Sequence, residues 1–368
     1  MKGMNFMGIK AIVTAGGTAG HINPAIAIAK QITSHGGEVL FIGKEGGMET
    51  DLVSKEGFPI KCIKVAGFKR SLSPSNIKTV ALAAKGLAET RKIIKDFAPD
   101  IVIGCGGYVS GPAVFSAAMM KIPTLIHEQN VFPGMTTKIL SRAVDRICVS
   151  FEESIKLLPG KKKAVLTGNP VREGILNVNP TTAKSELGIN EPTLLVFGGS
   201  LGAKKINDSM LELIKTKTPD FRIIWGTGKR YYEEIMESLK NIELGDKITI
   251  TPYIYNMDTV MAASDIVVSR AGAIAISEIC AMGKCSVLIP SPYVTNNHQE
   301  HNAAALQSAG ASVMLRENEL CADLLFDTVS SLFADSNKME SISVNALAMA
   351  KPTASKDIFA EITLLTRH

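Results

Sequence analysis

Short runs of apolar residues alternate along the chain with longer stretches whose apolar residues repeat at helical spacing. In the first half, the runs lie at residues 9–13, 38–42, 60–65, 101–103, 124–127 and 146–149. The second half repeats the pattern at residues 193–197, 222–225, 248–251, 266–268, 286–289 and 311–315. Because β-branched runs separated by helices are typical of parallel sheets, the pattern predicts an α/β protein with two doubly wound parallel sheets.

A break in this pattern near Gly168 divides the chain into two halves. Gly168, Asn169 and Pro170 can continue neither a helix nor a central strand, because proline has no backbone N–H and a fixed φ angle. We therefore expect a hinge over Leu166–Arg172 between two Rossmann-like domains, residues 1–168 and residues 169–368. The final helix of the chain can pack back on the first domain.

Two of the apolar runs lead into glycine-rich turns that are followed by helical sequence. Gly16–His21 follows the run at residues 9–13, and Gly198–Ala203 follows the run at residues 193–197. A strand, a glycine turn and a helix N-terminus in that order form a backbone cradle for an anion. We expect the two domains to face one another across a cleft, where one ligand contacts both helix N-termini.

His21 ends the first glycine turn and is the candidate general base. An imidazole ordinarily titrates near neutral pH, so it can accept a proton from a substrate hydroxyl. The alternative is a nucleotide-fold turn with an incidental histidine, because a glycine-rich turn is a weak motif by itself.

Three further polar segments follow predicted strands. Arg270–Glu278 contains small residues that allow a ligand close to the backbone, and Glu278 can accept both hydroxyls of a ribose. Residues 290–302 are dense in amide and imidazole groups, which suit sugar hydroxyls. His127–Asn130 places polar groups at the carboxyl end of a strand, where ligands bind in such sheets. Alternatively, Glu278 is a surface glutamate that is favoured near the positive end of its helix. The alternative for residues 290–302 is a surface loop that caps the next helix.

The composition indicates a globular protein, with 46% hydrophobic and 20% charged residues. Its six cysteines show no Cys-x-x-Cys pair and no metal-ligand spacing, which fits reduced thiols in the cytosol better than disulfides or a zinc site. The first residues show no secretion signal. The longest uncharged stretch, residues 101–120, contains glycines and Pro112 that would break a membrane-spanning helix. We therefore expect a strand, a third glycine turn and a helix there.

The net charge of +5 is unevenly distributed. Between residues 61 and 95 the one acidic residue is Glu89, and the basic residues are Lys61, Lys64, Lys69, Arg70, Lys78, Lys85, Arg91, Lys92 and Lys95. Apolar residues such as Phe68 and Leu72 are interleaved with them. Such a surface attracts an anionic membrane leaflet, at about 1 kcal/mol per basic residue, and the alternative is an ordinary amphipathic helix with solvated lysines. No nucleic-acid-binding module is recognisable, so we expect no nucleic acid partner.

Together these segments resemble one family, the MurG-type N-acetylglucosaminyltransferases of bacterial peptidoglycan synthesis. The matching segments occur in the family's order: Gly16–His21, Gly106–Pro112, His127–Asn130, Gly168–Arg172, Gly198–Ala203, Arg270–Glu278 and Asn297–Asn302. Each is weak alone, but the ordered set is specific. The resemblance implies the two-domain GT-B architecture.

The resemblance also implies an inverting transfer of N-acetylglucosamine from UDP-N-acetylglucosamine to the 4-hydroxyl of the muramoyl sugar on an undecaprenyl-diphosphate lipid, which converts lipid I to lipid II. It implies a peripheral location on the cytoplasmic face of the cell membrane. The chain has no Asp-x-Asp pair of the kind that holds a metal on a sugar diphosphate, so we expect no metal and no cofactor. Helix N-termini, Ser200 and Arg172 would then meet the charge of the leaving diphosphate.

Individual roles follow from the resemblance, position by position. Thr18, Ala19 and Gly20 look like donor contacts, Asn130 and Arg172 like contacts to the sugar and diphosphate, Ser200 like a phosphate contact, Ile254 like the backbone contact to uracil, and Gln299 like a sugar-hydroxyl contact. The wall beside the ribose and diphosphate is Ala273, Ile274, Ala275, Ile276, Ser277 and Glu278. His21 is the candidate base, and Glu128 is its rival.

Three other functions fit the same residues. A related glycosyltransferase would transfer a sugar from a UDP-sugar to diacylglycerol, and a nucleotide-sugar epimerase with the same two-domain fold would need no lipid. A non-catalytic membrane scaffold that binds a nucleotide sugar is the third, although it would have little use for His21, Glu278 and Gln299 together.

Overall fold

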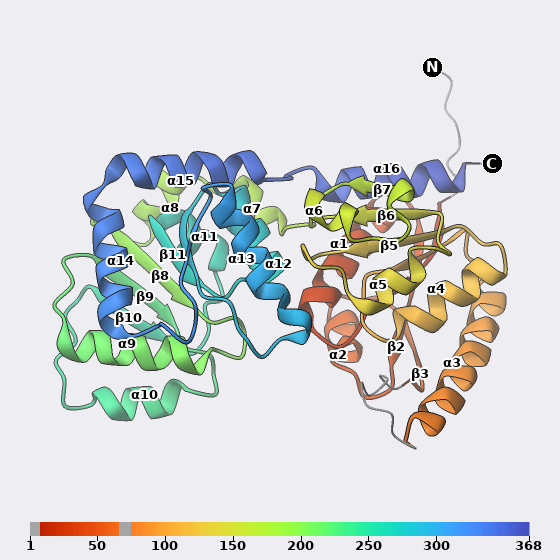
Figure 1. The fold of residues 1–368 in the computed structure, drawn as a ribbon, viewed down its shortest axis with the longest axis horizontal. Helices are drawn as coiled ribbons and strands as arrows, with labels where there is room; N and C mark the ends of the chain where they lie inside the picture. The colour runs from red at the N-terminus through yellow and green to blue at the C-terminus, as the bar shows by residue number, and fades with distance from the viewer. Residues whose placement is uncertain (1–7, 66–74, 368) are drawn as a thin grey trace. The chain divides into compact units, whose positions relative to one another are not determined.

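A computed structural model of the chain describes residues 8–65 and 75–367 and divides the chain into two compact units (Figure 1). The first unit comprises Met1–Pro170 together with Lys351–His368, and the second comprises Val171–Ala350. Each unit contains one parallel sheet with helices on its faces. The predicted α/β class with two doubly wound parallel sheets is therefore confirmed.

In the described part of the first unit, the sheet has seven strands in the order β3-β2-β1-β4-β5-β6-β7. Their bounds are β1 (Lys10–Thr14), β2 (Glu38–Lys44), β3 (Ile60–Ile63), β4 (Ile101–Gly104), β5 (Thr124–Glu128), β6 (Arg146–Val149) and β7 (Ala164–Leu166). The pattern of apolar runs missed β7, and we expected Leu166 to begin a hinge. Leu166 instead ends this short edge strand, which pairs with β6.

Helices cover both faces of the first sheet. They are α1 (Ala19–Ser34), α2 (Met48–Lys55), α3 (Ser75–Phe97), α4 (Ser110–Met119), α5 (Met135–Leu140), α6 (Glu152–Lys156) and α16 (Ala354–Thr366). Helices α1, α2 and α16 bury one apolar cluster, and α3, α4 and α5 help to bury a second. The chain's last helix, drawn in blue in Figure 1, packs along α1 through the fully buried Ile358 and Ile362.

The described strands of the second unit form a six-stranded sheet in the order β10-β9-β8-β11-β12-β13. Their bounds are β8 (Thr193–Phe197), β9 (Arg222–Gly226), β10 (Ile248–Thr251), β11 (Ile266–Ser269), β12 (Cys285–Leu288) and β13 (Val313–Met314). The helices are α7 (Glu173–Asn177), α8 (Pro180–Glu186), α9 (Lys204–Thr216), α10 (Tyr232–Leu239), α11 (Met257–Ala263), α12 (Ala273–Ala281), α13 (His298–Ser308), α14 (Ala322–Ala334) and α15 (Ser336–Met349). In each unit the strand order reverses beside the first strand, and ligands of such sheets bind at the carboxyl ends next to that reversal.

Three aspartates that directly precede a strand align the amino ends of neighbouring strands. Asp100, Asp145 and Asp265 precede β4, β6 and β11. Each donates its own N–H to the carbonyl of the first residue of the next strand in the sheet, and its carboxylate accepts that residue's N–H, at 2.8 Å for Lys10, 2.9 Å for Thr124 and 2.9 Å for Thr193. This two-way pairing satisfies polar backbone groups at the strand ends and sets the register.

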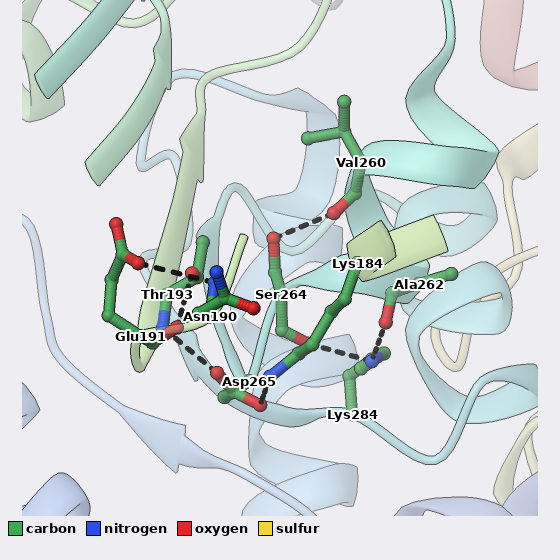
Figure 2. Close-up of polar contacts among 9 residues, drawn as sticks. All are labelled: Lys184, Asn190, Glu191, Thr193, Val260, Ala262, Ser264, Asp265 and Lys284. Carbon is green, nitrogen blue, oxygen red and sulfur yellow. Dashed lines mark hydrogen bonds and ion pairs between the residues drawn. The ribbon is translucent and has the colours of Figure 1, made fainter. Parts of the chain in front are cut away.

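Figure 2 shows how Asp265 is held in the second unit. Its Oδ2 accepts the N–H of Thr193, and its Oδ1 accepts the ammonium of Lys184 from α8 at 2.8 Å. Beside it, Lys284 donates to the carbonyls of Ala262 and Ser264, each at 2.7 Å, and so caps the carboxyl end of α11. Burial lowers the pKa of the Lys284 ammonium to about 8. Two lysines and one aspartate therefore connect α8 and α11 to the sheet.

In the described part of the chain, no helix is long and apolar enough to cross a membrane. The expected order of strand, glycine turn and helix over residues 101–120 is confirmed by β4 and α4. Of the basic stretch, Lys69 and Arg70 lie outside the described residues, as do Phe68 and Leu72. The exposed basic side chains that the structure describes in this stretch are Lys61, Lys64, Lys85, Arg91, Lys92 and Lys95.

We predict that Asp265→Ala destabilises the second unit by about 1–3 kcal/mol, because it leaves the Thr193 N–H and the Lys184 ammonium without their acceptor. Trp225 is the chain's one tryptophan and is fully buried in the same unit. Its fluorescence during urea denaturation therefore measures the change in the free energy of unfolding.

Asp265→Asn is the matched control for this measurement. Its amide oxygen can still accept the Thr193 N–H and only the charge facing Lys184 is lost, so we expect a smaller destabilisation. Equal denaturation midpoints for the two variants would show that the hydrogen bond to Thr193 contributes nothing.

Candidate functional site

The first glycine turn connects β1 to α1. The helix begins at Ala19, inside the segment Gly16–His21 that was expected to form the turn, so Gly20 and His21 lie in its first turn and Thr18 is its N-cap. Gly17 has a φ of 89°, which favours glycine. The first turn contains no acidic residue. The N–H groups and the positive dipole end of α1 therefore lie beside His21, and no acidic residue of the helix itself occupies them.

The turn after β4 packs closely against His21. Gly106 has a φ of 109°, and a Cβ added there would lie 2.5 Å from His21 Nδ1. A Cβ at Gly107 would lie 2.3 Å from the carbonyl oxygen of Gly16, whose N–H donates to Gly106 at 3.3 Å. Larger residues at either glycine would displace the imidazole or the first glycine turn.

A chain of hydrogen bonds reaches His21 from the end of β5. His21 Nδ1 lies 2.8 Å from Gln129 Oε1, and Gln129 Nε2 lies 3.0 Å from His127 Nδ1. At the other side of the ring, His127 Nε2 lies 3.0 Å from the carbonyl oxygen of Gly168. Burial of His127 lowers its pKa to about 4, although the hydrogen bond to Gly168 opposes this shift. His127 is therefore neutral near pH 7.

Glu128 is 2% exposed at the end of β5. Its Oε1 accepts the backbone N–H and the side-chain amide of Asn130, at 3.1 and 3.3 Å, and its Oε2 accepts the N–H of Gly134 at 3.0 Å. The carboxylate therefore holds the loop that carries Asn130. Because both oxygens are used inside the unit, this arrangement favours His21 over Glu128 as the proton acceptor.

Glu49 is a residue that the sequence reasoning missed. It lies in the first turn of α2 and is 1% exposed. Its Oε1 accepts the N–H of Lys44 at 2.7 Å, and its Oε2 accepts the N–H of Gly17 at 3.4 Å. Glu49 therefore joins the end of β2 to the first glycine turn. The sequence did contain a signal for Glu49, because Gly46-Gly47, directly before α2, repeats the order of strand, glycine turn and helix.

The second glycine turn connects β8 to α9. Gly199 and Gly202 have φ angles of 86° and 76°. A Cβ at Gly202 would lie 2.1 Å from the carbonyl oxygen of Thr227, so this turn packs against the turn after β9. Ser200 is exposed within it. An exposed hydroxyl beside a helix N-terminus is an arrangement that can bind phosphate.

Arg172 and Glu278 form an ion pair. Arg172 Nε donates to Glu278 Oε1 at 2.7 Å, and the two side chains are 53% and 8% exposed. Burial opposes the charge of Arg172, but the hydrogen bond and charge of Glu278 outweigh it and raise the pKa of the guanidinium. Two residues that were expected to contact the diphosphate and the ribose therefore lie in contact.

The helix that carries Glu278 begins directly after β11 at Ala273, with Gly272 as its N-cap. Ile274, Ala275 and Ser277 are half-buried, whereas the side chain of Ile276 is 1% exposed and its N–H donates to Gly272 at 2.9 Å. Ile276 therefore contributes to the core of the unit, as does Ala273, which is 8% exposed.

The last two candidates lie after β10 and at the start of α13. Ile254 is buried against Gly226. Its two neighbours in sequence, Tyr253 and Tyr255, have ring centroids 4.9 Å apart. Gln299 lies in the first turn of α13, and its Oε1 accepts the N–H of Ser291 at 2.9 Å. The loop after β12 therefore fixes the orientation of this amide.

The candidates fall into two groups. The first unit brings together Thr18, Ala19, Gly20, His21, Glu128 and Asn130, and the second unit carries Arg172, Ser200, Ile254, residues 273–278 and Gln299. Over residues 8–65 and 75–367, no three or more His, Cys, Asp and Glu side chains cluster so that they could hold a metal ion.

Known proteins resemble this chain over nearly its whole length. Residues 11–149 match the glycosyltransferase family 28 N-terminal domain, and residues 193–358 match the C-terminal domain of that family. The chain is 50% identical, over 95% of its length and 96% of the relative, to the UDP-N-acetylglucosamine–N-acetylmuramyl-(pentapeptide) pyrophosphoryl-undecaprenol N-acetylglucosamine transferase of Acetivibrio thermocellus. The enzyme of the same name from a Thermoanaerobacter species is 45% identical over 97% of the chain and all of the relative. The crystal structure of Acinetobacter baumannii MurG superposes with a TM-score of 0.79, at 26% identity, over 96% of this chain and 99% of that one.

We predict that acid destabilises the first unit through His127. Its pKa is lowered from 6.5 to about 4, so the unfolded chain binds the proton more readily than the folded chain. The stability associated with neutral His127 is complete above about pH 6.5 and is lost as the pH falls through about 4, by on the order of 3 kcal/mol. Urea denaturation, monitored by circular dichroism across this pH range, measures the slope of the free energy of unfolding against pH.

In His127→Gln the slope between pH 6.5 and 4 should be smaller than in the wild type. The same substitution at the exposed His35 is the control for loss of a histidine and should keep the wild-type pH dependence. Wild-type and His127→Gln proteins with the same slope would contradict the burial argument.

Proposed function

The chain belongs to glycosyltransferase family 28, and we infer from this membership that it transfers N-acetylglucosamine from UDP-N-acetylglucosamine to N-acetylmuramyl-(pentapeptide) pyrophosphoryl-undecaprenol. The observation that carries this conclusion is the 50% identity with a transferase of that name over 95% of the chain. The acceptor is lipid I and the product is lipid II, so the protein is an enzyme of peptidoglycan synthesis.

The donor is bound by the second unit in this proposal. One carboxylate oxygen of Glu278 accepts a hydrogen bond from Arg172, and the other accepts one from a ribose hydroxyl. The guanidinium of Arg172 supplies positive charge to the diphosphate. Ser200 and the N–H groups at the start of α9 and α12 bind phosphate oxygens. The backbone of Ile254 contacts uracil, and Gln299 contacts a sugar hydroxyl. As the C1–O bond to the diphosphate breaks, these groups stabilise the charge that develops on the leaving UDP.

His21 is the general base of the proposed reaction. The acceptor's 4-hydroxyl oxygen bonds to C1 of N-acetylglucosamine on the face opposite the diphosphate, which inverts that carbon, and its proton passes to His21. The support for His21 is its place in the first turn of α1, half-buried beside the glycine turns. Asn130, and the turn formed by Thr18, Ala19 and Gly20, provide polar groups for the substrates.

A peripheral location on the cytoplasmic face of the membrane fits the surface of the first unit. Phe115 and Met119 on α4 are 42% and 59% exposed, and Met135 and Ile139 on the neighbouring α5 are each 65% exposed. Each pair is spaced to lie on one face of its helix. Exposed apolar side chains on adjacent helices mark interaction sites, and the basic residues of the 61–95 stretch favour an anionic leaflet.

We predict that purified protein forms a disaccharide-linked lipid from UDP-N-acetylglucosamine and a short-chain lipid I analogue. His21→Ala should lower kcat by about 10²–10⁴-fold, because it removes the general base, while the KM for UDP-N-acetylglucosamine stays within about two-fold. His35→Ala, at the exposed carboxyl end of the same helix, is the control and should keep wild-type kcat.

The assay separates the alternatives. Transfer to diacylglycerol but not to the lipid I analogue would indicate the related lipid glycosyltransferase. Turnover of the nucleotide sugar without any lipid would indicate the epimerase, and neither transfer nor turnover would indicate a binding scaffold. A loss of donor affinity that matches the loss of kcat in His21→Ala would assign His21 a structural role. Activity that disappears with a chelator would contradict the metal-free expectation.

We predict that Met135→Gln/Ile139→Gln weakens binding to phosphatidylglycerol vesicles by about ten-fold or more, because two exposed apolar side chains no longer enter the leaflet. This loss should persist at high salt. Val344→Gln, an exposed valine on α15 of the second unit, is the matched control and should bind as the wild type does.

The charge-reversal variant Lys69→Glu/Arg70→Glu tests the electrostatic part of the membrane proposal. Its binding should be weaker at low salt and approach that of the wild type as salt rises. Vesicle binding that neither double variant reduces would remove the membrane proposal.

A further inference from the structure

Gln129 links His21 to His127 by hydrogen bonds, and the proposed function leaves it without a role. It follows β5 directly and is 2% exposed. Its side chain reaches the carbonyl oxygens of Cys105 and His127 and the ring of His127 on one side, and the ring of His21 on the other.

The surroundings of the Gln129 amide determine which end carries the nitrogen. The end that faces β4 and β5 lies 2.9 Å from the carbonyl oxygen of Cys105 and 3.1 Å from that of His127. Carbonyl oxygens only accept hydrogen bonds, so the donor –NH₂ must be at this end. The oxygen of the amide therefore faces His21, at 2.8 Å from Nδ1.

His127 supports the same orientation. Its Nε2 faces the carbonyl oxygen of Gly168 at 3.0 Å and must donate to it. Because burial keeps the ring neutral, its Nδ1 carries a lone pair and accepts from Gln129 Nε2 at 3.0 Å. Every group in the chain from Gly168 to Gln129 therefore has one possible donor or acceptor role.

The role of His21 follows from these constraints. An amide oxygen cannot donate, so His21 Nδ1 must carry a hydrogen and donate it to Gln129. The lone pair of the neutral ring is then on Nε2. Gly106 packs so closely against the Nδ1 side of the ring that a Cβ there would lie 2.5 Å from that nitrogen.

We propose that Gln129 is a positioning residue that fixes the neutral tautomer of His21, with hydrogen on Nδ1 and the proton-accepting lone pair on Nε2. This inference rests on the proposed function of His21 as the general base. When the acceptor hydroxyl gives up its proton, the proton binds Nε2, and the Nδ1–H continues to donate to the amide oxygen. Gln129 orients the base without placing a negative charge beside it, unlike the carboxylate that orients histidine in many hydrolases.

The tautomer can be measured directly, apart from catalysis. The full chain labelled with ¹⁵N-histidine contains six histidines, and the His21→Ala spectrum identifies the signals of His21. For the neutral ring, we expect Nδ1 to show the chemical shift of a protonated ring nitrogen and Nε2 that of an unprotonated one. The reverse assignment in the wild-type protein would overturn the proposal, whatever the activity of His21→Ala.

Gln129→Met keeps the length of the side chain and removes the hydrogen-bonding oxygen. We expect His21 to lose its single tautomer and kcat to fall by about 10- to 10²-fold, less than in His21→Ala, with the KM for UDP-N-acetylglucosamine unchanged. Ser150→Ala is the matched control, because Ser150 lies in the same buried cluster, with its hydroxyl 3.4 Å from His127 Nε2 and 2.9 Å from the carbonyl oxygen of Glu128. It should keep both the tautomer and kcat.

The outcomes separate this inference from the proposed function. An unchanged tautomer or unchanged kcat in Gln129→Met would overturn the role of Gln129. A rise in KM that matches the loss of activity would assign Gln129 to substrate binding instead. If His21→Ala retains full kcat, the proposed base is wrong, while the tautomer measurement still tests whether Gln129 orients the ring.

Discussion

The parallel direction of the strands is the constraint on which the rest of this structure depends. All strand pairs described in both sheets are parallel, so the carboxyl ends of neighbouring strands lie at one edge of each sheet. Turns that are distant in sequence therefore meet: the turns after β1 and β4 pack around His21, and the turn after β8 packs against the turn after β9. At the opposite edge, Asp100, Asp145 and Asp265 pair with the first residues of adjacent strands and maintain the register.

The carboxyl edge of the first sheet brings polar groups into a buried environment, where an unpaired group would be costly. His127, Glu128 and Gln129 are each at most 2% exposed, and each has hydrogen-bond partners. Because these partners come from Cys105 directly after β4, from the loop to Gly134 and from Gly168, the orientation of each side chain is determined by several segments at once. In the proposed mechanism, this buried network orients His21, the base at the start of α1.

Much of the fold could be predicted from local pattern. The apolar runs at residues 146–149, 193–197 and 248–251 coincide with β6, β8 and β10. The pattern failed where hydrogen bonding to a neighbouring strand, and not the run of apolar residues, sets the extent of a strand. Strand β7 has only three residues and was missed, and in β13 only two of the five expected residues pair. The start of α1 at Ala19 was also missed, since a helix end depends on backbone geometry as well as on apolar spacing.

The site was predictable as a set of segments but not as a set of contacts. Motifs identified the turns that carry His21, Ser200 and Glu278, because glycine and small residues mark close approach of the backbone. The bond between His21 and Gln129 and the ion pair between Arg172 and Glu278 each join residues more than a hundred positions apart. No local pattern contains such information. Gly46-Gly47 marks the turn before Glu49, but it does not indicate the hydrogen bond from Gly17 to Glu49.

Hydrogen–deuterium exchange of the full chain, with and without UDP, tests the central claim that the carboxyl edge of the second sheet binds the donor. The account predicts slower exchange with UDP at residues 198–203 and 270–278, and no change at residues 262–265 on the amino edge of the same sheet. Protection confined to the amino edge, or no protection anywhere in the second unit, would contradict it.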